Sequence, residues 1–257
     1  MEIIGQREVR LLQCGDVWHV RPVGQCALRS YDDLSEAQEI GEADQLELPQ
    51  GDPLVALLDG LPLTGHHLLA GRIRVDDPDD YESAYQAHER RHGTAMASLI
   101  CHGDLDGGTM PCNRPLYVRP VMQPRRGFDG QYVYEAIPES VLPVNLIHRA
   151  VRRLYEHENG EPPVAPGIRV INLSIGDPSH PLDREMSAWA RLLDWLSWKY
   201  NVLFVVSAGN HPEDIELSIP RTNLNTLADA DREKAVIEAQ VQDTRHRRLL
   251  SPAETVN

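Results

Sequence analysis

Cysteine is scarce in this sequence of 257 residues, and its four copies are widely spaced. Cys14, Cys26, Cys101 and Cys112 include no C-x-x-C pair, so we predict no zinc knuckle built on cysteine. Such dispersed cysteines are typical of reduced thiols in a cytoplasmic protein, which is the localisation that we expect. A disulfide is compatible with the spacing, although nothing in it requires one.

Basic residues and long apolar runs are also in short supply. The chain has 25 Lys and Arg against 39 Asp and Glu, whereas binding of nucleic acid phosphates needs clustered basic side chains. No stretch approaches the roughly 18 consecutive apolar residues of a membrane-spanning helix. The N-terminal residues also lack the basic start, apolar middle and small-residue cleavage site of a secretory signal. We therefore expect neither nucleic acid nor a membrane among the partners.

Apolar runs alternate with amphipathic segments along the middle of the chain. Continuous apolar runs indicate strands that are buried on both faces, as in parallel sheets. We predict such strands over residues 54–58, 116–122, 168–174 and 202–206. Apolar residues at helical spacing predict helices over residues 92–100, 141–156 and 183–200. This alternation implies right-handed crossovers. The predicted fold class is therefore α/β, a doubly wound parallel sheet with helices on both faces.

Polar residues stand where three of the predicted strands end. Asp59 directly follows the first strand, Ser174 closes the third, and Asn210 comes shortly after the fourth. The carboxyl ends of parallel strands lie at one edge of the sheet, where open α/β folds place their sites. His92 begins the helix after the first strand and can reach the same edge. Gly93 beside it is expected to allow a sharp turn and the close approach of another group.

One chemistry that these residues support is a catalytic triad. Asp59 would accept a hydrogen bond from one ring nitrogen of His92, and the other nitrogen would take a proton from a serine nucleophile. Asn210 would donate its side-chain amide to the oxyanion that forms on the attacked carbonyl. Residues 174–176, extended at the sheet edge, would pair with the substrate backbone as an added strand.

Four segments of the chain together resemble signatures of the subtilisin-like serine peptidases. They are, in chain order, Asp59-Gly60, His92-Gly93-Thr94-Ala95-Met96-Ala97, Asn172-Leu173-Ser174-Ile175-Gly176 and Ser207-Ala208-Gly209-Asn210. The order, aspartate before histidine, is that of the family, and the likeness covers roughly residues 52 to 211. The resemblance implies a serine endopeptidase that works through an acyl-enzyme. Asp59 and His92 would then be triad members and Asn210 would form the oxyanion hole. The substrate cleft would be lined by Ser174, Ile175 and Gly176. We expect no cofactor and no metal ion.

The sequence departs from this family at the nucleophile. The family's serine lies in a Gly-Thr-Ser stretch at the start of a later helix, and this sequence contains no such stretch. Ser218 and Ser251, the serines after Asn210, lack the flanking glycine and the small residues that should follow. The resemblance therefore implies a catalytic domain that is incomplete at its C-terminus, with the serine encoded beyond Asn257 or supplied by another polypeptide. We predict little or no peptidase activity for the chain as it stands. The alternative is an inactive subtilisin-like module that binds peptides along residues 174–176.

A metal site is a second chemistry for the same histidine. His88-Glu89-Arg90-Arg91-His92 satisfies the H-E-x-x-H pattern of zinc peptidases, in which one helical face carries both histidines. Gly93 disfavours a helix just after His92, and the two arginines would crowd positive charge near the metal. We therefore favour the triad. The segment Asp76-Asp77-Pro78-Asp79-Asp80 offers carboxylates for calcium, but we expect it to be a solvated acidic loop.

The chain is expected to form a peptidase domain over residues 51–257, preceded by an N-terminal extension over residues 1–50. The extension holds an acidic stretch at residues 32–47 and no candidate chemistry. An inserted surface helix is predicted near residues 224–248. The expected partners are a peptide or protein substrate and either the missing C-terminal part of the domain or a partner protein.

Overall fold

A computed structural model describes residues 27–28, 47–105, 110–126, 133–211, 215–224, 226–245 and 247–256 of the chain. The N-terminal extension predicted over residues 1–50 lies almost entirely outside these ranges. The predicted strands and helices of the peptidase domain fall inside them. In this part of the chain, no helix is both long and apolar enough to cross a membrane.

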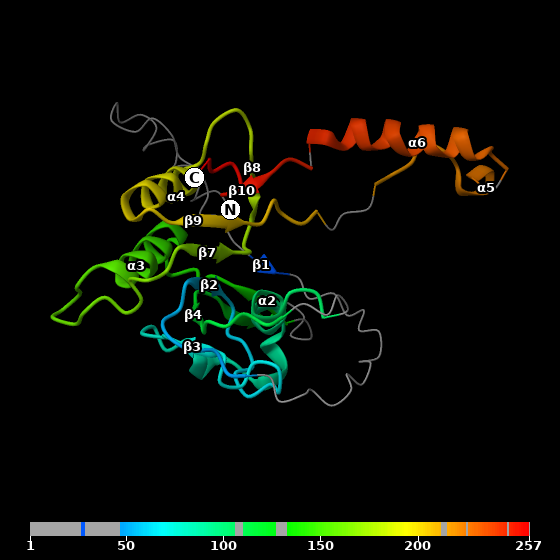
Figure 1. The fold of residues 1–257 in the computed structure, drawn as a ribbon. Coiled ribbons are helices and arrows are strands. Elements are labelled where there is room, and N and C mark those ends of the chain that lie inside the picture. Colours follow the sequence, from blue (N-terminus) through cyan, green and yellow to red (C-terminus); the bar gives the residue numbers. More distant parts are fainter. Residues whose placement is uncertain are drawn as a thin grey trace, which may run out of the picture.

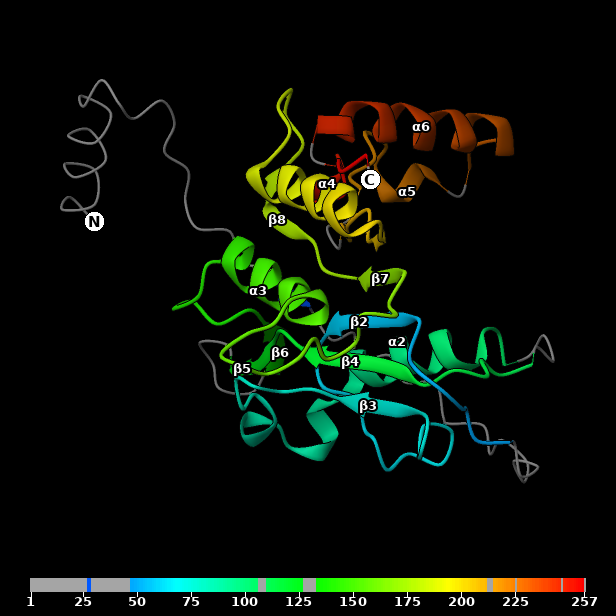
Figure 2. The same cartoon turned by 60° about the vertical axis from the view of Figure 1, so that its left-hand side comes forward.

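A five-stranded parallel sheet forms the centre of the fold (Figure 1). Its strands, in spatial order, are β3 (Ile73–Val75), β4 (Leu116–Pro120), β2 (Val55–Asp59), β7 (Val170–Leu173) and β9 (Leu203–Val206). Figure 2 shows β3, β4, β2 and β7 one above another. All neighbouring pairs run parallel, which confirms the predicted sheet. Only β3 was not predicted, because its short and largely exposed sequence carries no buried apolar run.

Helices cover both faces of this sheet, as predicted. They are α2 (Arg91–His102) on one side, and α3 (Pro143–Tyr155) and α4 (Ala188–Tyr200) on the other (Figure 1). The buried strand β2 explains this arrangement, because its side chains alternate between the two layers. Ala56 and Leu58 belong to the core that α3 and α4 complete, whereas Leu57 packs in a second core with Ala97 and Cys101 of α2. Both faces of β2 are therefore buried, which requires the continuous apolar run of its sequence.

The helix predicted over residues 183–200 is shorter than expected. It begins only after Ser187, whose hydroxyl accepts a hydrogen bond from the backbone N–H of Ala190 and so caps the first turn. Arg184, inside the predicted range, has a left-handed backbone with φ of 74°, which no helix contains. The periodic apolar pattern therefore did not show where this helix begins.

Smaller elements surround the central sheet. An antiparallel sheet joins β1 (Ala27–Leu28), β6 (Val133–Ala136) and β5 (Gln123–Arg126), and β8 (Asp177–Pro181) pairs with β10 (Leu250–Ser251). Short helices are η1 (Glu82–Ala84), η2 (Ala87–Glu89), α5 (Arg221–Leu224) and η3 (Asp243–Arg245). The helix α6 (Asp229–Gln242) lies within the predicted insertion and projects away from the sheet (Figure 1). Of its residues only Ala239 is buried, so this helix is largely exposed.

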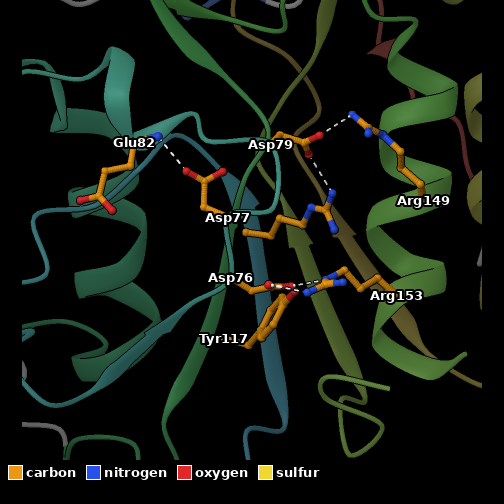
Figure 3. A network of polar contacts seen from close by, with 8 residues as sticks. Asp76, Asp77, Asp79, Glu82, Tyr117, Arg149 and Arg153 are labelled. Carbon is orange, nitrogen blue, oxygen red and sulfur yellow. Dashed lines mark hydrogen bonds and ion pairs between the residues drawn. The ribbon is translucent and has the colours of Figure 1, made fainter. Parts of the chain in front are cut away.

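The acidic segment at residues 76–80 is not the solvated loop that the sequence suggested. Asp76 follows the edge strand β3, and its carboxylate accepts two hydrogen bonds from Arg153 of α3, at 2.9 and 3.1 Å (Figure 3). The hydroxyl of Tyr117 donates a third, at 2.6 Å. Burial opposes ionisation of Asp76, but these hydrogen bonds and the charge of Arg153 outweigh it and hold its pKa below the ordinary value.

The carboxylates of Asp77 and Asp79 are also engaged by protein groups. Asp79 lies between Arg119 of β4, at 2.8 Å, and Arg149 of α3, at 2.9 Å (Figure 3). Asp77 accepts a hydrogen bond from the backbone N–H of Glu82 at 2.7 Å. Among the described residues, no group of three or more metal-binding side chains is found. The acidic segment therefore fastens β3 to the helix layer through arginines that the sequence pattern did not connect to it.

The Asp76–Arg153 pair predicts a pH-dependent loss of stability. Replacing Arg153 by Met should lower the free energy of unfolding at pH 7 by about 1–3 kcal/mol, because a largely buried carboxylate loses its charged donor. Because the folded-state pKa of Asp76 is lowered, its contribution exists above pH 3.8 and disappears as the pH falls through the folded-state value. Urea unfolding of both proteins between pH 3 and pH 7 measures this difference.

A matched control is the exposed pair of Arg125 with Glu139, at 2.6 Å. Replacing Arg125 by Met should change the unfolding free energy by about 0.5 kcal/mol or less, as expected for a surface ion pair. Equal losses in the two variants would contradict the structural role given to Arg153.

Candidate active site

The first side chain of the site, Asp59, is delivered by the buried strand β2. It is the last residue of that strand and is fully buried. Its Oδ1 accepts a hydrogen bond from the backbone N–H of Gly60 at 2.6 Å and lies 2.7 Å from Nδ1 of His92. Because Oδ1 acts as an acceptor, Nδ1 of His92 is the donor in this contact.

The helix α2 brings His92 to the end of β2. His92 is the second residue of this helix, and Ala97 and Cys101 anchor the helix against the sheet. A Cβ atom on Gly93 would lie only 2.2 Å from the carbonyl oxygen of Gly60. The expected close approach at Gly93 is therefore present. The expected sharp turn is not, because Gly93 lies within the first turn of α2.

Thr94 attaches the start of α2 to the chain that leaves β2. Its hydroxyl accepts a hydrogen bond from the backbone N–H of Leu63 at 2.8 Å and donates one to the carbonyl of Arg90. Through these two hydrogen bonds, Thr94 links the loop after β2 to the start of the helix that carries His92. This leaves the imidazole little freedom to move relative to Asp59.

The environment of His92 favours a charged imidazole. Burial opposes its protonation, but the hydrogen bond and charge of Asp59, with a smaller effect from Glu135, outweigh burial and hold the pKa of His92 above its ordinary value. The side chain is 29% exposed. No described residue forms a hydrogen bond with Nε2. The arrangement therefore offers a histidine whose inner nitrogen is bound to a carboxylate and whose outer nitrogen can accept a proton.

A second buried acid that was not predicted lies beside this pair. Glu135 of β6 is only 6% exposed, and the hydroxyl of Tyr85 donates a hydrogen bond to its Oε1 at 2.7 Å. The backbone N–H of His92 favours the ionised form of the same carboxyl group. Burial, assisted by the charge of Asp59, raises the pKa of Glu135 to about 7. A single glutamate in a short hairpin strand has no spacing or neighbour that would single it out.

The other predicted residues follow the neighbouring strands of the sheet. Leu57 of β2 pairs with Asn172 of β7, and Leu173 pairs with Val206 of β9, so the carboxyl ends of these strands lie side by side. Ser174 comes directly after β7. Asn210 follows β9 after a short segment and has an exposed side chain. The topology thus places the predicted residues at one edge of the sheet.

The side chains of residues 174 and 175 are engaged by the protein itself. The hydroxyl of Ser174 donates to Oδ1 of Asn172 at 2.8 Å, and the side chain of Ile175 is fully buried. Leu250 lies against Gly176, where a Cβ atom would be 3.3 Å from that of Leu250. Among the described residues, none makes a backbone-to-backbone hydrogen bond with residues 174–176. In the described part of the chain, the N–H and C=O groups of residues 174–176 thus have no backbone partner, although Ile175 itself is fully buried.

The two serines that follow Asn210 do not contact His92. Ser251 is buried in β10, and its hydroxyl lies 2.6 Å from that of Ser187. Ser218 is exposed in a separate segment. In the described part of the chain, no serine forms a hydrogen bond with the imidazole of His92.

The H-E-x-x-H pattern does not form a helical metal site. His88 and Glu89 lie in η2, whereas His92 lies in α2. Arg90 separates the two helices with a non-helical backbone, at φ −81° and ψ 41°. The two histidines therefore do not share a helical face, which the zinc-peptidase pattern requires.

The contact between Gly93 and Gly60 predicts a severe effect of adding one methyl group. Changing Gly93 to Ala forces a Cβ atom against a backbone oxygen, so the helix must shift away from β2. We expect a loss of about 1–3 kcal/mol of unfolding free energy or more, as for an overpacked core. Thermal and urea unfolding measure it.

Gly65 is the matched control, because a Cβ atom there would meet nothing within 4 Å. Changing Gly65 to Ala should leave stability within about 1 kcal/mol of the original or raise it slightly. A Gly93→Ala protein as stable as this control would show that α2 does not depend on the contact.

Glu135 predicts that the folded protein loses stability as the pH rises. A folded-state pKa of about 7 against an ordinary value of 4.5 means that the folded state holds this proton longer than the unfolded state. The contribution is present below pH 4.5 and is lost as the pH rises through 7, an effect of about 3 kcal/mol. Compared with a Glu135→Gln variant, the original protein should therefore become progressively less stable between pH 5 and pH 8. A stability difference that stays constant over this range would contradict the raised pKa.

Comparison with known proteins adds one match. A model of the subtilase family matches residues 51–231, which is more than half of the chain. The matched range contains Asp59, His92, Ser174 and Asn210. No curated protein sequence matches the chain.

Proposed function

The chain belongs to the subtilase family of serine peptidases, and on this premise we propose that Asp59 and His92 form the acid–base part of a catalytic triad. The observation that carries this proposal is the 2.7 Å contact between Oδ1 of Asp59 and Nδ1 of His92. It leaves Nε2 as the proton acceptor on a partly exposed face of the ring. The reaction class is hydrolysis of a peptide bond through an acyl-enzyme.

In this mechanism His92 acts first as a base and then as an acid. Nε2 takes the proton of a serine hydroxyl as its oxygen attacks the peptide carbonyl. Asp59 stabilises the imidazolium that forms and keeps Nδ1 protonated throughout. Nε2 then gives the proton to the leaving amine, and a second cycle with water releases the acyl group.

Asn210 and the segment 174–176 supply the remaining parts of the proposed site. The exposed amide of Asn210 would donate a hydrogen bond to the oxyanion, an interaction whose loss costs about a hundred- to a thousandfold in turnover. The unpaired backbone of residues 174–176 would hold the substrate as an added strand beside β7. The register of β2, β7 and β9 supports placing both beside Asp59.

The serine nucleophile is proposed to come from polypeptide outside this chain. The described serines form no hydrogen bond with His92, and the sequence has no Gly-Thr-Ser stretch. This chain would therefore supply the base of the triad but no nucleophile. The chain by itself is proposed to have little or no peptidase activity.

Covalent labelling with a fluorophosphonate probe tests this proposal. The 257-residue chain should take up no label, whereas the product of the gene read beyond residue 257 should be labelled on a serine within that added part. In the longer product, Asp59→Asn and His92→Ala should each reduce the labelling rate by about a thousandfold or more, because the serine loses its base. Arg125→Met, which removes an ion pair with Glu139 and no catalytic group, serves as the control and should label normally.

Two outcomes would overturn the proposal in different ways. Labelling of Ser218 or Ser251 in the 257-residue chain would show that the nucleophile is already present. Labelling of the longer product at an unchanged rate in His92→Ala would remove His92 from the mechanism.

The unpaired backbone of residues 174–176 also supports a second candidate function. An inactive module with this edge would bind extended peptides without cutting them. Peptide binding together with no labelling of the longer product would favour this module over the peptidase.

A further inference from the structure

A second acid, Glu135, lies against the Asp59–His92 pair and has no part in the triad mechanism. Its carboxyl group is buried where β6 approaches the end of β2, and Oε1 would lie 1.9 Å from a Cβ atom placed on Gly60. The N–H of Gly60 donates to Asp59, and the backbone N–H of His92 favours the ionised form of Glu135. The two acids therefore both lie beside the short contact between β2 and α2.

Tyr85 gives Glu135 two alternative proton arrangements. The hydroxyl of Tyr85 lies 2.7 Å from Oε1 of Glu135 and 3.1 Å from the carbonyl oxygen of Met122. A hydroxyl has a single proton and can donate to only one of these acceptors at a time. When Glu135 is ionised, Tyr85 donates to it. When Glu135 is protonated, Glu135 can donate to Tyr85, and Tyr85 then donates to Met122.

The surroundings of this cluster make Glu135 change its charge near neutral pH. The titratable side chains that face it are Asp59 from β2, His92 from α2 and Tyr85 from the segment between η1 and η2. Burial and the charge of Asp59 raise the pKa of Glu135 to about 7, while Tyr85 and His92 act in the opposite direction. Burial and the neighbouring carboxyl raise the pKa of Tyr85, so its phenol stays protonated.

We propose that Glu135, oriented by Tyr85, is a positioning residue that adjusts the proton affinity of His92 as the pH changes. An ionised Glu135 attracts the imidazolium, and a neutral Glu135 does not. Its catalytic meaning rests on the proposed function of His92, but the coupling itself is a property of the folded chain. This role needs the carboxyl group of Glu135, and a residue that only filled the space would not provide it.

Coupling of this kind broadens the titration curve of His92. At low pH Glu135 is neutral, so the imidazole begins to lose its proton early. As the pH rises Glu135 ionises, and the remaining imidazolium is held to higher pH. The titration of His92 should therefore spread over a wider range than a single independent proton would give.

Nitrogen NMR of the full 257-residue chain, labelled in its histidines, tests the proposal. The His92 signal is assigned by its loss in a His92→Ala protein. In Glu135→Gln the His92 midpoint should move to lower pH, and the curve should narrow to that of one proton. Glu139→Gln removes an exposed acid from the chain just after β6 and should leave the His92 titration unchanged.

Tyr85→Phe is a second variant that keeps the carboxyl group. Without the hydroxyl donor, Glu135 should ionise at higher pH, so the His92 midpoint should again fall while the curve stays broad. This variant decides the question if Glu135→Gln fails to fold, as judged by circular dichroism. An unchanged His92 titration in a folded Glu135→Gln or Tyr85→Phe protein would overturn the proposal.

The titration tests the role of Glu135, and the labelling experiment tests the peptidase function. A coupled His92 titration without any labelling of the longer gene product would overturn the peptidase function and leave the coupling standing. Normal labelling that depends on His92, together with an uncoupled titration, would overturn only the role of Glu135.

Discussion

The hydrogen bond between Asp59 and His92 is the interaction on which the rest of the site depends. It joins the end of the buried strand β2 to the first turn of α2, the helix that covers one face of the sheet, at 2.7 Å. Such a contact requires the helix to approach the strand backbone closely, and Gly93 permits this by presenting no side chain to Gly60. The same close contact therefore determines both the packing of α2 on the sheet and the position of His92 beside Asp59.

Much of the fold could be predicted because its physical causes are local. The apolar run from Val55 to Leu58 must be covered on both faces, and the layers of α2 and of α3 with α4 cover it. The ends of elements were harder to predict. Ser187 caps α4 several residues after the periodic pattern suggested, because a cap depends on one hydrogen bond while periodicity averages over many residues.

The parts that the sequence did not reveal are contacts between distant segments. Arg153, which is 77 positions from Asp76 in the sequence, neutralises its carboxylate. The acidic loop that was expected to be solvated therefore connects a strand to a helix. Glu135 reaches the Asp59–His92 pair in the same way, from a hairpin strand without a recognisable pattern. Sequence spacing shows which residues share an element, but it does not show which carboxylate will meet which cation across the fold.

Asp59 holds His92 as the tautomer with its proton on Nδ1 and leaves Nε2 free to accept one. The ring-nitrogen chemical shifts of His92, measured above its pKa, test this claim most directly. Nδ1 should be protonated and Nε2 unprotonated, and this preference should be lost in Asp59→Ala. A neutral His92 protonated mainly on Nε2 in the original protein would contradict it.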